Sequence, residues 1–168
     1  DTPMYRPEMV AAFEDHFVLI AHETVPDRVK AARLAPAMRL TEEMVEACNR
    51  NGIRLHGPGR THKPGVCHRI VVEDYAAPGD IIALTDSHSP TAGVMNAFAF
   101  GVGSTAMAFA LRTGLMPVTV PKVVRVEISG DAKGILSPKD LILHLIGDPY
   151  FREEHWRETP TDTCIIEF

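Results

Sequence analysis

The sequence predicts an α/β fold, a three-layer arrangement in which helices cover both faces of a largely parallel sheet. Residues 81–84 form a short apolar run that ends in polar residues, which is typical of a buried parallel strand. Segments with clear helix signals, residues 41–51 and 137–147, alternate with further short apolar runs. Because the chain has 168 residues, we expect one domain over residues 1–168, as a piece of a longer protein.

The first elements are expected to be a short helix and a strand. Pro7 suits the first turn of an amphipathic helix over residues 7–15. Residues 17–21 are a strand candidate that runs into a polar pair, His22 and Glu23.

A stronger helix signal covers residues 41–51. Thr41 can serve as its N-cap, acidic residues fill the first turn, and Gly52 stands just past its end. After a short strand over residues 53–55, the glycines, prolines and histidines of residues 56–65 indicate an exposed loop.

The second half of the chain is expected to contain two helices and two further strands. The small residues over 94–103 predict a tightly packed helix, and alternation over 123–128 predicts a half-exposed strand. Ser137 as N-cap begins a helix that runs to Gly147, and residues 164–168 resemble a strand.

The composition excludes several kinds of partner and site. A net charge of −5 gives no reason to expect nucleic acid or an anionic membrane as partner, and no run approaches the length of a membrane span. The three cysteines, Cys48, Cys67 and Cys164, are widely separated and form no Cys-x-x-Cys. Odd, scattered cysteines fit a reducing cytoplasm better than a disulfide framework.

Asp86, Ser87 and His88 follow the predicted strand over residues 81–84 after one intervening residue, Thr85. The carboxyl end of such a strand is where open α/β sheets place their ligand sites. A carboxylate can orient an imidazole, which moves protons near neutral pH, while a serine can bind an oxyanion. The same residues also fit a loop in which Asp86 and Ser87 only cap the next helix.

Three other groups have a chemical and a structural interpretation. His68 stands five residues before Glu73, but a half-buried histidine often has only a structural role. The pair of His22 and Glu23 fits an exposed loop as well as a site. The glycines of residues 101–103 lack the third glycine of a dinucleotide fingerprint, and close helix packing explains them better.

Several separated motifs, taken in order, resemble the aconitase superfamily. The nearest members are the large subunits of 3-isopropylmalate dehydratase and homoaconitase, together with aconitase itself. The motifs are His68-Arg-Ile-Val-Val-Glu73, Pro78-Gly79, Asp86-Ser-His-Ser-Pro-Thr-Ala-Gly93, Gly101-Val-Gly103 and Ser137-Pro-Lys-Asp140. The resemblance covers nearly the whole chain and implies an aconitase-like domain.

The resemblance implies an iron–sulfur hydro-lyase. Such an enzyme reversibly dehydrates a hydroxy acid such as 3-isopropylmalate, homocitrate or citrate, and the first of these belongs to leucine biosynthesis. A [4Fe–4S] cluster in the full-length protein would bind substrate through its unliganded iron and act on the leaving hydroxyl as a Lewis acid. The implied partner is a small subunit or a carboxyl-terminal swivelling domain.

The resemblance also implies roles for individual residues. His68 and Asp86 would form a histidine–carboxylate pair near the substrate hydroxyl, with His88 as a second catalytic imidazole. Ser87 would contact a substrate carboxylate or the cluster environment. Ser89, which stands where the family usually has threonine, would also contact substrate.

His22 and Glu23 match the place of an Asp–His pair that the family has after its first strand. The ungapped match sets His22 on the aspartate and Glu23 on the histidine, whereas a one-residue gap would keep His22 as the histidine with Ala21 in place of its acid. We expect both to be catalytic residues, although the usual pair is altered.

The resemblance places the three cluster cysteines and the serine base beyond Phe168, and the cysteines of this chain do not match them. We therefore expect no metal ligand in this chain and no catalysis by the chain alone. A relative that has changed substrate or lost the cluster, and a non-catalytic binding or regulatory module, remain alternatives. A weaker one is a mononuclear metal at His22, Glu23, His68 and His88.

Overall fold

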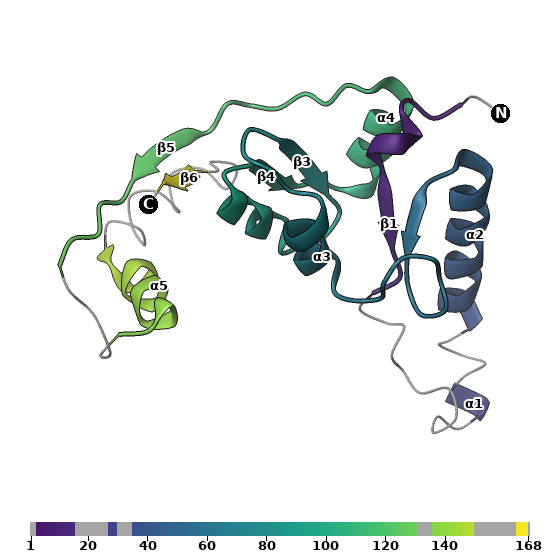
Figure 1. Cartoon of the computed structure of the whole chain (residues 1–168), viewed down its shortest axis with the longest axis horizontal. Coiled ribbons are helices and arrows are strands. Elements are labelled where there is room, and N and C mark those ends of the chain that lie inside the picture. Colours follow the sequence, from purple (N-terminus) through teal and green to yellow (C-terminus); the bar gives the residue numbers. More distant parts are fainter. Residues whose placement is uncertain (1–2, 16–26, 30–34, 131–135, 150–163, 168) are drawn as a thin grey trace. The chain divides into compact units, whose positions relative to one another are not determined.

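The computed structural model describes residues 3–15, 27–29, 35–130, 136–149 and 164–167 (Figure 1). The chain divides into two compact units, Asp1–Met116 and Pro117–Phe168. The single domain expected over residues 1–168 stays a prediction. The predicted strand over residues 17–21, with His22 and Glu23, lies outside the described residues.

The described elements alternate between helices and short strands. In the first unit they are η1 (Pro7–Met9), β1 (Ala11–Phe13), α1 (Asp27–Val29), α2 (Ala35–Asn51), β2 (Arg54–His56), α3 (Cys67–Asp74), β3 (Ile81–Leu84), η3 (Ser89–Met95), β4 (Phe98–Gly101) and α4 (Ser104–Thr113). In the second unit they are β5 (Lys122–Arg125), α5 (Pro138–Gly147) and β6 (Cys164–Glu167). No helix within the described ranges is both long enough and apolar enough to cross a membrane.

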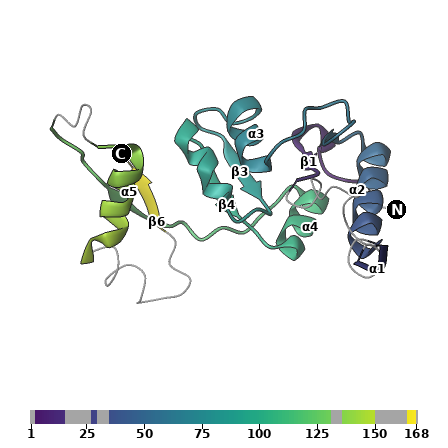
Figure 2. The same cartoon turned by 90° about the horizontal axis from the view of Figure 1, so that it is seen from below.

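The strands pair in parallel, which confirms the α/β class and the predicted strand direction. β1 pairs with β2, β3 with β4, and β5 with β6, so the described strands form three two-stranded sheets. Both views show β3 and β4 side by side (Figure 1 and Figure 2). Leu84 ends β3 and lies opposite Gly101 of β4.

The main core cluster lies where α3, β3 and η3 meet. Val71 of α3, Leu84 of β3 and Ala92 of η3 are buried against one another, and Phe13 of β1 and Ala99 of β4 pack on them. These contacts fix α3 against the carboxyl end of β3. That arrangement positions the polar residues of both elements.

The helix predicted over residues 7–15 is wrong. Only Pro7–Met9 is helical, as a short 3-10 turn, and Ala11–Phe13 is the strand β1. β1 pairs along its whole length with Arg54–His56 of β2. This long-range pairing overrides the local helical pattern, as tertiary context commonly does.

The helix predicted over residues 94–103 is also wrong. η3 ends at Met95; the next residue, Asn96, adopts a left-handed backbone conformation with φ of 58°, and β4 follows. The aromatic rings of Phe98 and Phe100 favour an extended strand. Gly101 is required by close approach rather than by helix packing, because an added Cβ would lie 3.3 Å from the main-chain oxygen of Asp86.

The helix predicted over residues 41–51 is present but begins earlier. α2 starts at Ala35, so Thr41 lies inside the helix and is not its N-cap. Pro36 in the first turn suits this earlier start. The predicted end is confirmed, since Gly52 follows α2 with φ of +68°.

The predicted start of α5 is confirmed by a complete capping box. Ser137 accepts from the main-chain N–H of Asp140, and the Asp140 carboxylate accepts from the N–H of Ser137. The hydrogen bonds from Ser137 lower the pKa of Asp140 below its ordinary value. The capping box therefore stabilises α5 above the ordinary carboxyl pKa, and this contribution is lost as pH falls through the lowered value.

Ser137→Ala is expected to raise the pKa of Asp140 toward its ordinary value, because the side-chain donor is lost. The pKa is measured by following the Asp140 carboxyl carbon by NMR as pH is lowered. Lys139→Ala, in the same exposed turn, is the control and should leave that pKa lowered.

Gly114 and Gly52 form a matched pair of helix ends. Their φ angles are +71° and +68°, but an added Cβ at Gly114 would meet the ring of Tyr5, whereas Gly52 has open space. Gly52→Ala is expected to cost about 1 kcal/mol of unfolding free energy from the left-handed backbone alone. Gly114→Ala should cost about 1–3 kcal/mol more, because Tyr5 must also move. Urea unfolding of both variants checks this, and equal losses would contradict the Tyr5 contact.

Candidate functional site

The turn after β3 is organised by Asp86. Its side chain is buried, and its Oδ2 accepts a hydrogen bond from the main-chain N–H of His88 at 2.6 Å. This local bond is typical of aspartate in turns. It leaves the carboxylate fixed at the carboxyl end of β3, where the sequence predicted a site.

Ser89 stabilises the same turn from inside. It is fully buried, and its hydroxyl donates to the main-chain oxygens of Asp86 and Leu84. An added Cβ at Gly101 would lie 3.5 Å from this hydroxyl, so β4 closes tightly over it. The predicted contact between Ser89 and a substrate stays a prediction, and in this structure the hydroxyl serves the turn.

The start of α3 brings two more side chains to this turn. The main-chain N–H of Cys67 donates to Asp15 Oδ2 at 2.8 Å. Asp15 lies two residues past the end of β1, so a carboxylate distant in sequence caps the first turn of α3, where negative charge is favoured. Cys67 and His68 therefore begin α3 in a fixed orientation.

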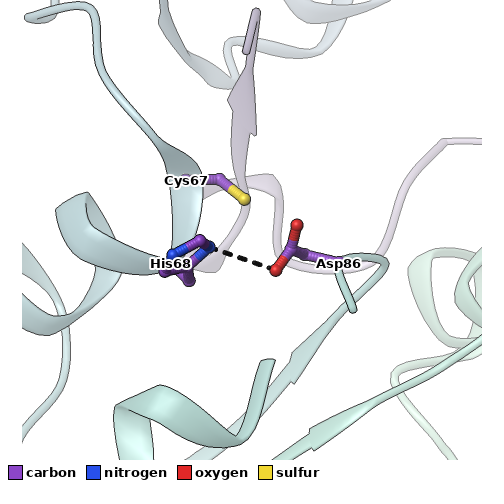
Figure 3. A group of neighbouring side chains, drawn as sticks. All are labelled: Cys67, His68 and Asp86. Carbon is purple, nitrogen blue, oxygen red and sulfur yellow. Dashed lines mark ion pairs between the residues drawn. The ribbon is translucent and has the colours of Figure 1, made fainter. Parts of the chain in front are cut away.

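His68 and Asp86 form the predicted pair. Nδ1 of His68 lies 3.2 Å from Oδ2 of Asp86, and the two side chains are 19% and 7% exposed (Figure 3). Low exposure strengthens the interaction between an imidazolium and a carboxylate. Among the described residues, however, His68 Nδ1 has no hydrogen-bond partner of good geometry. The two atoms are therefore within ion-pair distance but do not form a well-aligned hydrogen bond.

His88 lies beside this pair and reaches solvent. Its ring centroid is 4.9 Å from that of His68, and its Nδ1 is 3.8 Å from Asp86 Oδ2. Ser87 Oγ lies 3.1 Å from the same nitrogen of His88. The His88 side chain is 65% exposed, so it lies at the open edge of the site.

Cys67 is the third member of a compact cluster. Its Sγ, a ring nitrogen of His68 and a carboxylate oxygen of Asp86 all lie within 4.8 Å of one another (Figure 3). Burial raises the pKa of the Cys67 thiol to about 12, and the carboxylates of Asp15 and Asp86 add to the shift. The free thiol is therefore protonated near neutral pH and is a poor nucleophile.

Glu73 does not join His68. Lys63 Nζ lies 3.0 Å from Glu73 Oε2, and Arg69 Nη2 lies 3.3 Å from Glu73 Oε1. The Lys63 ammonium lowers the pKa of Glu73. The carboxylate that faces His68 is thus Asp86, as the resemblance implied, and not Glu73.

Sequence reasoning missed Asp15 and Cys67. The signal for Asp15 was present, because Asp15 and His16 follow the apolar run of β1 just as Asp86 follows β3. The mistaken helix over residues 7–15 concealed it. His16 itself lies outside the described residues.

The described residues do not fit an iron–sulfur cluster. Such a cluster needs several converging thiolates. The two cysteines with described side chains, Cys48 in α2 and Cys67 in α3, are buried in different surroundings. Cys48 is near Glu14 and Arg60, whereas Cys67 is near Asp15 and Asp86.

The sequence of this chain is similar to proteins of one known family. The sequence model of the aconitase family (aconitate hydratase) matches residues 1–155. A 3-isopropylmalate dehydratase large subunit of Methanopyrus kandleri is 36% identical over 143 residues, which are 84% of this chain and 33% of that protein. One from Methanoregula boonei is 48% identical over 85 residues, covering 50% of this chain and 20% of that protein.

A relative from a eukaryote matches as well. An aconitase–ribosomal protein bL21m fusion protein of Schizosaccharomyces pombe is 36% identical over 127 residues, covering 76% of this chain and 13% of that protein. The chain thus spans about a third or less of the length of these relatives.

Proposed function

This chain belongs to the aconitase family, and we propose that it is the substrate-binding part of a hydro-lyase acting on a hydroxy di- or tricarboxylic acid. The observation that supports this most is the pair of His68 Nδ1 and Asp86 Oδ2, 3.2 Å apart at the carboxyl end of β3. An imidazole oriented by a buried carboxylate is suited to proton transfer near neutral pH.

The part of the reaction that we assign to this chain is protonation of the leaving hydroxyl. When the carbon–oxygen bond breaks, its electron pair stays on oxygen, which takes a proton and leaves as water. Because Nδ1 of His68 faces Asp86, the opposite ring nitrogen, Nε2, holds the proton that is donated. Asp86 orients the imidazole ring, and the proton on the neighbouring carbon goes to a base outside this chain.

We assign the remaining predicted residues to the edge of the same site. His88 lies over the ring of His68 and serves as the second imidazole, while the exposed Ser87 contacts a substrate carboxylate. The catalytic role of His22 and Glu23 stays a prediction. Asp15 and His16, which follow β1 after one intervening residue, are a second candidate for the family's Asp–His pair. In the full-length protein, His16→Gln and His22→Gln separate the two, since only loss of the true partner should lower kcat strongly.

The cofactor and partners belong to the whole protein. We propose a [4Fe–4S] cluster held by cysteines outside this chain, and a small subunit or swivelling domain that completes the site. The named relatives include large subunits of 3-isopropylmalate dehydratase, so 3-isopropylmalate is the first substrate to test, with homocitrate and citrate next. A cytoplasmic location is part of the same proposal.

The test is anaerobic cluster reconstitution of the full-length protein, with and without its small subunit, followed by assays on the three hydroxy acids. We expect formation of the unsaturated product from one of them. A protein that takes up no cluster and converts none of the three acids would contradict the hydro-lyase assignment and favour a binding or regulatory module.

A further inference from the structure

We propose that Cys67, His68 and Asp86 form a binding site for a single zinc ion. We also propose that a bound ion blocks proton transfer by His68. The first part stands on the geometry of the cluster alone, whereas the second rests on the proposed function.

The donor atoms of the cluster are already close together. Cys67 Sγ, a ring nitrogen of His68 and an Asp86 oxygen lie within 4.8 Å of one another, on α3 and the turn after β3. The core contacts of Val71 and Leu84 hold these two elements together, so the cluster is part of the packed fold. A site on rigid elements loses little entropy when it closes on a ligand.

The separation of His68 and Asp86 also fits two ligands of one metal ion. Nδ1 of His68 is buried and lacks a hydrogen-bond partner within the described part of the chain, although Asp86 Oδ2 is 3.2 Å away. Nitrogen and oxygen ligands of a tetrahedral zinc ion, each about 2.0–2.1 Å from the metal, lie about 3.3 Å apart. The observed separation therefore matches two ligands of one ion.

The chemistry of the donors selects the kind of ion. A thiolate and an imidazole are preferred by zinc over magnesium or calcium, which take oxygen ligands. A single cysteine cannot hold an iron–sulfur cluster. The nearby Asp15 carboxylate, bound to the Cys67 N–H, adds negative charge that favours a cation.

The fourth position faces solvent. His88 lies at the open edge, with its ring 4.9 Å from that of His68 and its side chain 65% exposed. It can turn toward the cluster as a fourth ligand, or water can take that position. When the sulfur–zinc bond forms, the Cys67 thiol releases its proton to solvent, and His68 Nδ1 and Asp86 become metal ligands.

Cobalt(II) is a suitable probe, because cobalt bound to a thiolate gives a sulfur charge-transfer absorption band. The experiment titrates the full-length protein with cobalt and compares Cys67→Ala with Cys48→Ala. Cys48 is the matched control, since it is also a free, buried cysteine but lies in α2. Any cysteines elsewhere in the protein are the same in both variants.

We expect the Cys48→Ala variant to keep the sulfur charge-transfer band of bound cobalt. Added zinc should remove this band by competing for the site. The Cys67→Ala variant should lose that band and bind cobalt at least about tenfold more weakly. Cys67→Ser provides a second test if alanine disturbs folding, because its hydroxyl fills the same position but gives no sulfur band. Cobalt spectra that are the same in all variants would overturn the site.

The inhibitory part is tested separately by zinc titration of turnover. The rate of each variant is compared with its own rate without zinc, so a difference in basal activity between the variants does not affect the comparison. We expect the zinc concentration for half-inhibition to rise about tenfold or more in Cys67→Ala and to stay the same in Cys48→Ala. Equal inhibition of both would overturn the blocking role. An enzyme that turns over none of the acids would contradict the proposed function, while the cobalt spectra would still decide the metal site.

Discussion

Replacing His68 by glutamine in the full-length protein is expected to lower kcat about 10²–10⁴-fold, the usual contribution of a positioned acid or base. Glutamine preserves size and polarity but cannot exchange a proton near neutral pH. KM should change much less, because the lost group acts on the leaving hydroxyl in the transition state. Steady-state kinetics on the accepted hydroxy acid measure both constants.

His62→Gln is the matched control for this substitution. His62 is half-buried and has its ring 5.0 Å from that of His56, in the loop that precedes α3. Its described contacts are with His56, so its replacement should leave kcat within a small factor. If both variants lose activity equally, His68 has no special role in proton transfer.

A large loss of stability is expected from Glu14→Ala. The Glu14 side chain is 5% exposed and accepts two hydrogen bonds from Arg60, from Nη2 at 2.6 Å and from Nε at 3.0 Å. Its removal leaves the guanidinium without its buried partner and opens space beside Gly57. The free energy of unfolding should fall by about 2–4 kcal/mol, toward the lower end because Arg60 can turn to solvent.

The exposed pair of Arg6 and Glu8 is the control for Glu14. Its atoms are 2.9 Å apart, a similar distance, but both side chains are exposed. Glu8→Ala should therefore leave the denaturation midpoint nearly unchanged, since water screens the pair. Chemical denaturation of both variants measures the difference, and equal midpoints would show that burial of Glu14 contributes little.

Local sequence signals predicted the elements whose ends are set by their own residues. The capping box of Ser137 and Asp140 begins α5, and the run over residues 81–84 with its polar successors gives β3 and the turn of Asp86. These features depend on neighbours along the chain. Gly52 was predicted as a helix end for the same reason.

The features that the sequence did not predict depend on contacts between distant segments. β1 exists because Ala11–Phe13 pairs with β2, more than forty residues later, and this hid Asp15 at the end of a strand. β4 forms because Asn96 turns the chain and Gly101 fits closely against Asp86. The cluster of Cys67 with His68 and Asp86 likewise needs α3 packed against the carboxyl end of β3.

The most direct test of the proposed role of this chain is a crystal structure of the full-length protein with a hydroxy acid bound. The quantity to measure is the distance from His68 Nε2 to the hydroxyl oxygen of the acid. The account predicts a hydrogen-bond distance, about 2.6–3.2 Å, with Nδ1 still facing Asp86. A bound acid whose hydroxyl lies far from His68, with another side chain in its place, would contradict it.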